Sequence, residues 1–308
     1  MSFTEQVKNE LARIPRESRE SRVSELLALL RMSGSFITGS HGSWGLEFST
    51  GNSAVARRVL VYLKKDFGFL PSTMVRQGRR LRKKNVYTLM VDPSKEGLHF
   101  LNTMGLSPLA GIDDMEQLKD PEERRAYLAG AFLGGGSVSR PQSDYHLEMV
   151  TQSPHFAETL VKMMKSFQMK ARMTDRKNDY IVYLKDGDDV SGFLQIVGAT
   201  QSYMDFESVR VVKDMRNRVN RQVNCETANL QKTVNAAVRQ THMVQQLLQR
   251  ENISNLSPKI KEACEVRLQH PNASLSELAQ ICGITKSGLA HRFKKIEAMV
   301  AEMGMGNS

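Results

Sequence analysis

The sequence contains few cysteines, and none of them are spaced to bind a metal. Cys225, Cys264 and Cys282 are the only three in 308 residues, and no Cys-x-x-Cys motif is present. An odd number of widely separated cysteines argues against a disulfide framework and against a cysteine-based zinc site. We expect reduced thiols that pack as small apolar side chains, and we predict neither a metal nor another cofactor.

Long apolar runs are also missing. No stretch reaches the roughly 18 apolar residues of a membrane-spanning helix, and the opening residues MSFTEQVKNELARIP lack the apolar centre of a signal peptide. We therefore expect a cytoplasmic protein with no membrane partner. Aromatic residues make up only 6% of the chain, which weakens base stacking on single strands as its main mode of binding.

Acidic residues are outnumbered by basic ones. The 43 lysines and arginines exceed the 33 aspartates and glutamates and give a net charge of +10. Such an excess suits a polyanionic partner, of which nucleic acid is the commonest. The chain is also too long for one ordinary hydrophobic core, so its length predicts two domains.

The first half of the chain repeats itself at an offset of about 100 residues, which is typical of a duplicated unit. The matching pairs are Ser24–Phe36 with Tyr127–Val138, Gly45–Thr50 with His146–Thr151, Ala54–Phe67 with Phe156–Phe167, Val86–Val91 with Tyr180–Lys185, and Glu96–Gly105 with Asp189–Gly198. Each unit reads as helix, two strands, helix, two strands, helix.

This order of elements predicts an α+β fold in which helices cover antiparallel sheets. We expect the first helices of the two units to pack together, with Ala129 and Gly130 permitting a close approach. Leu109–Arg125 is the expected connector between the units.

A helix-turn-helix is predicted near the end of the chain. Ser274-Leu275-Ser276-Glu277 has the form of a capping box, Gly283 suits a left-handed turn position, and a second helix follows over Ser287–Val300. Leu278, Cys282, Ile284 and Leu289 are the expected core between the helices. The residues expected to reach DNA, with Arg292 pointing outward, are Ser274, Ser276, Thr285, Lys286, Ser287, His291, Arg292, Lys294 and Lys295.

Between these regions the sequence is basic and polar. The run KDMRNRVNRQVN, Lys213–Asn224, has neither glycine nor proline and reads as a polar helix or a linker. We predict an α+β domain over residues 1–205, a basic linker over residues 206–228, and an all-α helix-turn-helix domain over residues 229–303.

The whole chain resembles the WhiA family of bacterial regulators. The resemblance rests on LLALLRMSG and LAGAFLGGG, which look like degenerate LAGLIDADG motifs, on RNRVNRQVNCETANLQKTV, and on SLSELAQICGITKSGLAHRFKKI. It implies a domain like that of LAGLIDADG homing endonucleases, followed by a helix-turn-helix similar to sigma factor region 4. It also implies a DNA-binding factor in cell division, chromosome segregation or sporulation.

The catalytic acids of a LAGLIDADG nuclease are replaced in this sequence. Metal-assisted cleavage needs carboxylates around a hard cation, but Ser33 and Gly135 stand before the final glycines, and Arg31 and Leu133 stand at the other acidic place. We therefore predict a protein without enzymatic activity. The alternative is an active nuclease with relocated carboxylates. Glu47 and Glu148 occupy matching places, although outward-facing strand residues are the simpler interpretation.

The most basic stretch is the predicted hairpin Met74–Leu89. Its side chains are expected to contact phosphates of double-stranded DNA, which adds affinity without choosing a sequence. The cations are Arg76, Arg79, Arg80, Arg82, Lys83 and Lys84. Two alternatives stay open: an RNA-binding module, and a domain that holds a ligand or a protein such as RNA polymerase or another regulator.

Overall fold

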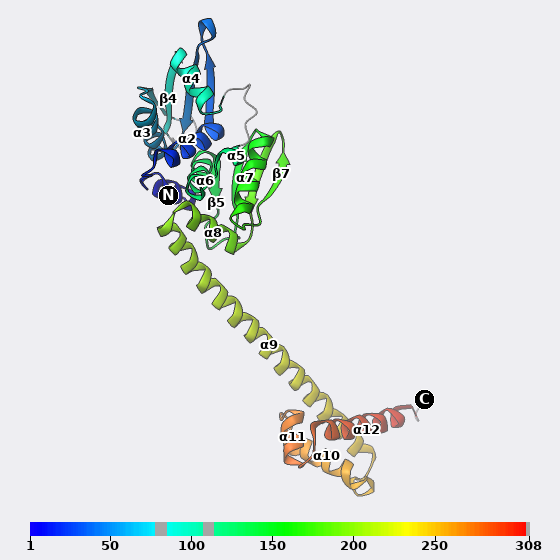
Figure 1. The fold of residues 1–308 in the computed structure, drawn as a ribbon. Helices are drawn as coiled ribbons and strands as arrows, with labels where there is room; N and C mark the ends of the chain where they lie inside the picture. Colours follow the sequence, from blue (N-terminus) through cyan, green and yellow to red (C-terminus); the bar gives the residue numbers. More distant parts are fainter. Residues whose placement is uncertain (78–84, 107–113, 306–308) are drawn as a thin grey trace. The chain divides into compact units, whose positions relative to one another are not determined.

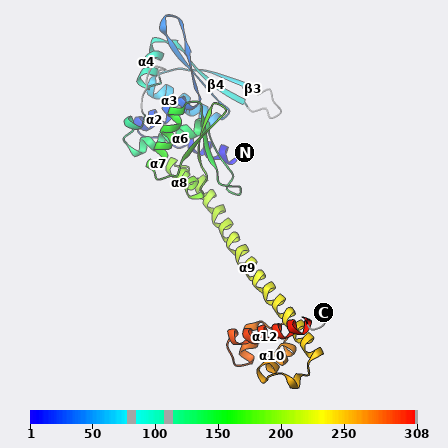
Figure 2. The same cartoon turned by 90° about the vertical axis from the view of Figure 1, so that its right-hand side faces the viewer.

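The structure is a computed structural model that describes residues 1–77, 85–106 and 114–305 (Figures 1 and 2). The chain forms two compact units, Met1–Lys213 and Asp214–Ser308, and each is described by itself. Within the described ranges, no helix combines the length and the apolar character needed to cross a membrane.

The first unit contains the predicted duplication, and the α+β fold class is confirmed. Its sheets have the same order, β1-β2-β4-β3 and β5-β6-β8-β7, with antiparallel neighbours. The first repeat comprises α2 (Arg19–Ser33), β1 (Gly34–Thr38), the 3-10 turn η1 (Ser40–Gly42), β2 (Trp44–Thr50), α3 (Ser53–Phe67), β3 (Ser72–Gln77), β4 (Asn85–Ser94) and α4 (Lys95–Thr103). The second comprises α6 (Pro121–Gly135), β5 (Gly136–Val138), β6 (Leu147–Thr151), α7 (Pro154–Ser166), β7 (Arg172–Arg176), β8 (Asp179–Leu184) and α8 (Gly187–Val197).

Each sheet has one face in the core and one face without a covering helix among the described residues. On β2, Leu46 and Phe48 are buried while Glu47 and Ser49 are half-exposed, because alternate strand residues point to opposite faces. Helix α3 covers the core face, since its buried Val59 belongs to the same apolar cluster as Leu46 and Phe48. The opposite face of each sheet is called the outer face below.

Helices α2 and α6 pack side by side at the centre of the unit (Figure 1). Leu26–Leu30 is buried at every position, as expected of a helix that is covered on all sides. Gly130 allows the close approach predicted for it: a β-carbon there would meet the carbonyl oxygen of Glu25 and the β-carbon of Ala28. Ala129, the other small residue predicted at this contact, is fully buried.

The connector between the repeats ends five residues earlier than predicted, at Asp120, because α6 begins at Pro121. Asp120 caps the first turn of α6 through the amide of Glu122, and Pro121 is the first residue of that helix. A proline fits this place because the first helical amides need no partner within the helix. The short helix α5 (Asp114–Gln117) precedes it, and residues 107–113 lie outside the described residues.

An N-terminal helix, α1 (Phe3–Leu11), was not predicted as an element of the core. It starts with a capping box between Ser2 and Glu5, and Phe3, Val7 and Leu11 are buried in the first unit. Phe3 also stacks on Phe206, with ring centroids 6.3 Å apart.

Lys8 lies on the same helix with its ammonium group 5.9 Å from the centre of the Phe132 ring. Burial lowers the pKa of Lys8 to about 8 from its ordinary 10.5. A protonated lysine therefore destabilises the folded state below pH 8. Between about pH 8 and pH 10.5 the unfolded chain still binds this proton, whereas the folded protein has released it. The folded protein therefore gains stability as the pH rises through this interval.

Lys8→Met should therefore raise the free energy of unfolding at pH 7 by about 1–2 kcal/mol. This is less than the free energy equivalent to the full pKa difference, because the side chain is partly exposed and water screens its charge. The advantage should shrink as the pH approaches 10. Urea unfolding at both pH values measures it, and Lys64→Met, at an exposed position of α3, is the control. A Lys8→Met variant that is equally stabilised at both pH values would refute the titration argument.

The second unit consists of helices, as predicted. Its elements include η2 (Ile253–Asn255), α10 (Pro258–Gln269), α11 (Leu275–Ile281) and α12 (Lys286–Met305). The helix α9 (Thr200–Arg250) enters it. Residues 206–228, predicted to be a linker, are helical throughout, and Val244 and Leu247 near the end of α9 are buried against the unit.

Candidate nucleic-acid interface

The turn between α11 and α12 is built by short-range hydrogen bonds. The amide of Glu277 donates to the Ser274 hydroxyl at 3.3 Å, and the Glu277 carboxylate accepts from the Ser274 amide at 2.6 Å. Gly283 has a φ of +62°, which a residue with a side chain rarely adopts. Thr285 then caps α12 by accepting from the amide of Gly288 at 3.1 Å. The capping box and the left-handed glycine were both predicted.

A small apolar core fixes the angle between these helices. Leu278 and Leu289 are fully buried, as predicted, and Cys282 and Ile284 are half-buried. Phe293 completes this core from the next turn of α12. Burial and the charge of Glu265 raise the pKa of Cys264 on α10 to about 11, so this thiol is protonated and packs as an apolar group.

The side of α12 that points away from this core is exposed and basic. Ser287, His291, Lys294 and Lys295 are all exposed, and so are Lys286, Thr285 and Ser276 at the start of the two helices. Residues 287, 291 and 294 follow helical spacing and therefore share one face. Hydroxyl, imidazole and ammonium groups on an open helix face can bond phosphates and base edges.

Two of the predicted contact residues, Arg292 and Ser274, are not exposed. The Arg292 guanidinium pairs with the Glu262 carboxylate of α10 at 2.5 Å and donates to the carbonyl of Lys259 at 3.3 Å. It is therefore half-buried between α12 and α10, which differs from the outward position expected from its spacing. Ser274 is half-buried as well, and its hydroxyl takes part in the capping box.

Sequence reasoning missed Arg267, which holds the chain before α11. This arginine is 1% exposed and donates to the carbonyls of Ala273 at 2.7 Å and His270 at 3.3 Å. It also donates to the Gln240 side chain at 2.6 Å, and its guanidinium lies 5.7 Å from the centre of the Phe293 ring. Burial lowers its pKa. Its place between the apolar Val266 and Leu268 is the one sequence signal that could have indicated burial.

The predicted basic hairpin is described only in part. Arg76 is exposed on β3, whereas Arg79, Arg80, Arg82, Lys83 and Lys84 lie outside the described residues. The matching hairpin of the second repeat places Arg172, Arg176 and Lys177 at exposed positions. Register with β8 puts Arg172 and Arg176 on the outer face of that sheet.

The positions of the lost nuclease acids lie at the ends of α2 and α6. A β-carbon on Gly135 would lie 2.6 Å from the sulfur of Met32 and 3.0 Å from the carbonyl oxygen of Val150. The Met32 side chain therefore occupies the space that an acidic side chain would need. Arg31, at the other acidic place, donates to the carbonyl of Gly105 at 3.2 Å. Among the described residues, no three His, Cys, Asp or Glu side chains gather where they could hold a metal.

Glu47 and Glu148 occupy equivalent outer-face positions, since each is paired across its sheet with a serine, Ser35 and Ser137. Glu148 accepts from the Ser137 hydroxyl at 3.2 Å and lies 3.0 Å from the His146 ring nitrogen. Both glutamates are half-exposed, as simple outward-facing strand residues are.

Three family models match the chain and together span most of it. The model for the WhiA N-terminal LAGLIDADG-like domain matches residues 19–107, and the model for the WhiA LAGLIDADG-like domain matches residues 124–216. The model for the WhiA C-terminal HTH domain matches residues 219–300.

Curated relatives are similar over nearly their whole length. A protein of Thermoanaerobacter sp. (strain X514) is 42% identical over 306 residues, which covers 96% of each chain. One of Desulforamulus reducens is 42% identical over 316 residues and covers 99% of this chain and 97% of the relative. Both are named probable cell division protein WhiA.

Solved structures share the fold. Full-length DUF199/WhiA from Thermatoga maritima aligns with a TM-score of 0.59 at 24% identity and covers 98% of this chain and 99% of that one. The N-terminal LAGLIDADG domain of DUF199/WhiA aligns with a TM-score of 0.51 at 27% identity and covers 64% of this chain and 90% of the other.

Proposed function

The chain belongs to the WhiA family, and from that premise we propose that it binds double-stranded DNA through α11 and α12 and acts as a regulator in cell division. In this proposal α12 lies in the major groove and reads base edges. The domain of two repeats adds affinity through phosphates, or holds a partner such as RNA polymerase. Chromosome segregation and sporulation are further processes in which such a regulator would act.

The main support for the proposal is that α12 has one buried apolar side and one exposed polar side. Leu289, Phe293 and Ile296 are buried, whereas Ser287, His291 and Lys294 are exposed together on the opposite side. Nothing in the described part of this unit covers that exposed side, so it is open to a ligand as large as duplex DNA. The matched family model for an HTH domain supports the same surface.

We also propose that the protein does not cut DNA. The Met32 side chain fills the place next to Gly135, and Arg31 brings a positive charge to the motif that holds a metal in nucleases. Both changes oppose cation binding, and the half-exposed Glu47 and Glu148 do not replace the lost acids.

We expect Lys286→Ala with Lys294→Ala to weaken binding to a selected duplex by about tenfold or more, because these cations lie on the exposed start and face of α12. The slope of log K against log salt should become shallower by about one for each phosphate that is no longer neutralised. The measurement is binding to a duplex enriched from a random library and to a scrambled one, at several salt concentrations. Magnesium should leave both duplexes intact.

Lys259→Ala with Lys261→Ala is the matched control, because it removes two positive charges from the exposed part of α10 in the same unit. It should retain most of the affinity and the preference for the selected duplex. Equal losses in the two variants would show that α12 is not the DNA-binding surface, and duplex cleavage in magnesium would restore the nuclease hypothesis.

A further inference from the structure

A cavity of about 400 Å³ lies between the loop after α1 and helix α3 in the first unit. This volume is in the range of small-ligand sites in proteins. Among the described residues, none that lines the cavity is acidic. Its charged lining consists of Arg13, Arg16, Arg22, Arg57, Arg58 and Lys65.

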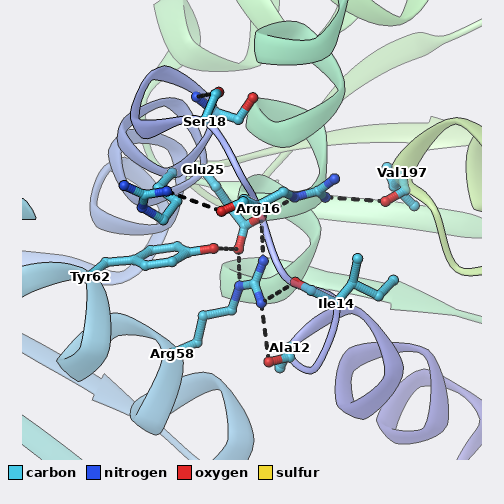
Figure 3. A network of polar contacts seen from close by, with 10 residues as sticks. Ala12, Ile14, Arg16, Ser18, Glu25, Arg58, Tyr62 and Val197 are labelled. Carbon is cyan, nitrogen blue, oxygen red and sulfur yellow. Dashed lines mark hydrogen bonds and ion pairs between the residues drawn. The ribbon is translucent and has the colours of Figure 1, made fainter. Parts of the chain in front are cut away.

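The inner wall of the cavity is held rigid by buried ion pairs (Figure 3). Arg16 and Arg58 donate to the same carboxylate oxygen of Glu25, at 2.8 and 3.0 Å, and Glu25 is fully buried. Arg58 also donates to the carbonyl of Ile14 at 2.6 Å. These bonds leave the two guanidinium groups little freedom, so this wall keeps its geometry before any ligand binds, with one positive charge in excess over Glu25.

The third cation of the wall is fixed in the same way. Arg22 bonds to the Asp66 carboxylate at 2.7 Å and to the carbonyl of Glu17 at 2.7 Å. The hydrogen bond and the charge of Asp66 raise the pKa of Arg22 against the effect of burial. For Arg58, burial lowers the pKa, but its hydrogen bond to Glu25 and the charge of Glu25 together raise it. Both groups therefore stay charged.

The rim of the cavity has positive charge in excess. Arg13, Arg57 and Lys65 are exposed, and in the described ranges of the chain they form no ion pair. Only Glu25 and Asp66 pair with any of the six lining cations there. Positive charges along a concave protein wall raise the local concentration of anions.

We infer that this cavity, named here the arginine pocket, binds a small phosphate compound that carries several negative charges. The planar forks of Arg13 and Arg57 match phosphate oxygens in pairs, and Lys65 adds a mobile point charge. The described lining offers phosphate-binding groups but no exposed aromatic ring, since its tyrosine, Tyr62, is 4% exposed. This favours recognition of the phosphates over recognition of a base.

Within the first unit, the arginine pocket lies apart from the outer face of the first sheet, which is the surface proposed there for DNA phosphates. Helix α3 lies on the core face of the first sheet, and Arg57 and Lys65 lie on the exposed side of that helix. The outer face of the sheet is on the opposite side. The ligand is therefore inferred to be a free phosphate compound, and the inference does not depend on DNA binding by α12.

Calorimetric titration of the full chain with inorganic pyrophosphate, at constant ionic strength, tests this inference. The variant Arg57→Gln with Lys65→Gln should lose affinity by about tenfold or more, because charge-assisted hydrogen bonds to phosphate are among the strongest polar contacts. The control is Lys64→Gln with Lys165→Gln, which removes the same charge at exposed positions of α3 and α7 outside the pocket. It should bind as the parent does.

Three outcomes would overturn the inference. The parent protein could release no heat with millimolar pyrophosphate. The pocket variant and the control could bind pyrophosphate equally, which would put the anion elsewhere. In the third outcome, the parent does not bind pyrophosphate, and the pocket variant binds duplex DNA more weakly than the control variant. That result would assign the pocket to the phosphates of DNA. We expect the pocket variant and the control variant to bind duplex DNA equally.

Discussion

Glu25→Gln should lower the free energy of unfolding of the first unit by about 3–5 kcal/mol, the range for removing one partner of a buried ion pair. Glutamine keeps the shape of the side chain and removes its charge. Arg16 and Arg58 would then be held against a neutral amide, with Arg58 only 7% exposed. The hydroxyl of Tyr62, which donates to the carboxylate at 3.4 Å, would also lose a charged acceptor. The pKa of Tyr62 is raised by burial and by the charge of Glu25.

Thermal unfolding should show a loss of roughly 10 °C for a unit of this size. Glu20→Gln, at an exposed position of the same helix, is the control and should change little. Glu25→Met together with Arg58→Met should be less harmful than Glu25→Gln alone, because it leaves fewer buried charges without a partner. A Glu25→Gln variant within about 1 kcal/mol of the parent, the size of effect expected at the surface, would contradict the argument.

The second large effect is expected at the contact of α2 with α6. A β-carbon on Gly130 would lie well under 3.0 Å from the carbonyl oxygen of Glu25, and 3.1 Å from the β-carbon of Ala28. A backbone atom cannot swing aside, so Gly130→Ala must push the helices apart. We expect a loss of about 3 kcal/mol, which exceeds the roughly 1 kcal/mol that alanine gains over glycine inside a helix.

Gly192 provides the matched control, because it is also inside a helix, α8, and a β-carbon there meets nothing within 4 Å. Gly192→Ala should raise stability by about 0.5–1 kcal/mol. The two substitutions are chemically identical and should have opposite signs in urea unfolding. Equal signs would mean that the α2–α6 contact adjusts more easily than its geometry indicates.

The sequence predicted the order of elements well because local signals set them. The matching stretches of the internal repeat indicated the same order of elements in both units. Ser274, Glu277 and Gly283 marked the ends of helices through features that span only a few residues. Such interactions depend on neighbours in the chain, so they can be inferred without knowledge of the fold.

Long-range pairing could not be predicted in the same way. Glu25 reads as a surface residue, and its burial follows from Arg58, which is 33 residues away in the sequence. Arg292 was expected to point outward, but Glu262 on another helix pairs with it. In both cases the partner is brought close only by the packing of whole helices, which helical spacing does not reveal.

The two repeats also differ at the centre of their contact, and this bears on how the molecule can be assembled. Ala28 and Gly130 occupy equivalent places, each the sixth residue before the glycine that ends its helix, Gly34 or Gly136. A pair of first repeats would put the β-carbon of Ala28 where only glycine fits against the carbonyl of Glu25. Two copies of the first half therefore cannot pack as the two halves of this chain do, and the first half needs the second, with its glycine, as its partner.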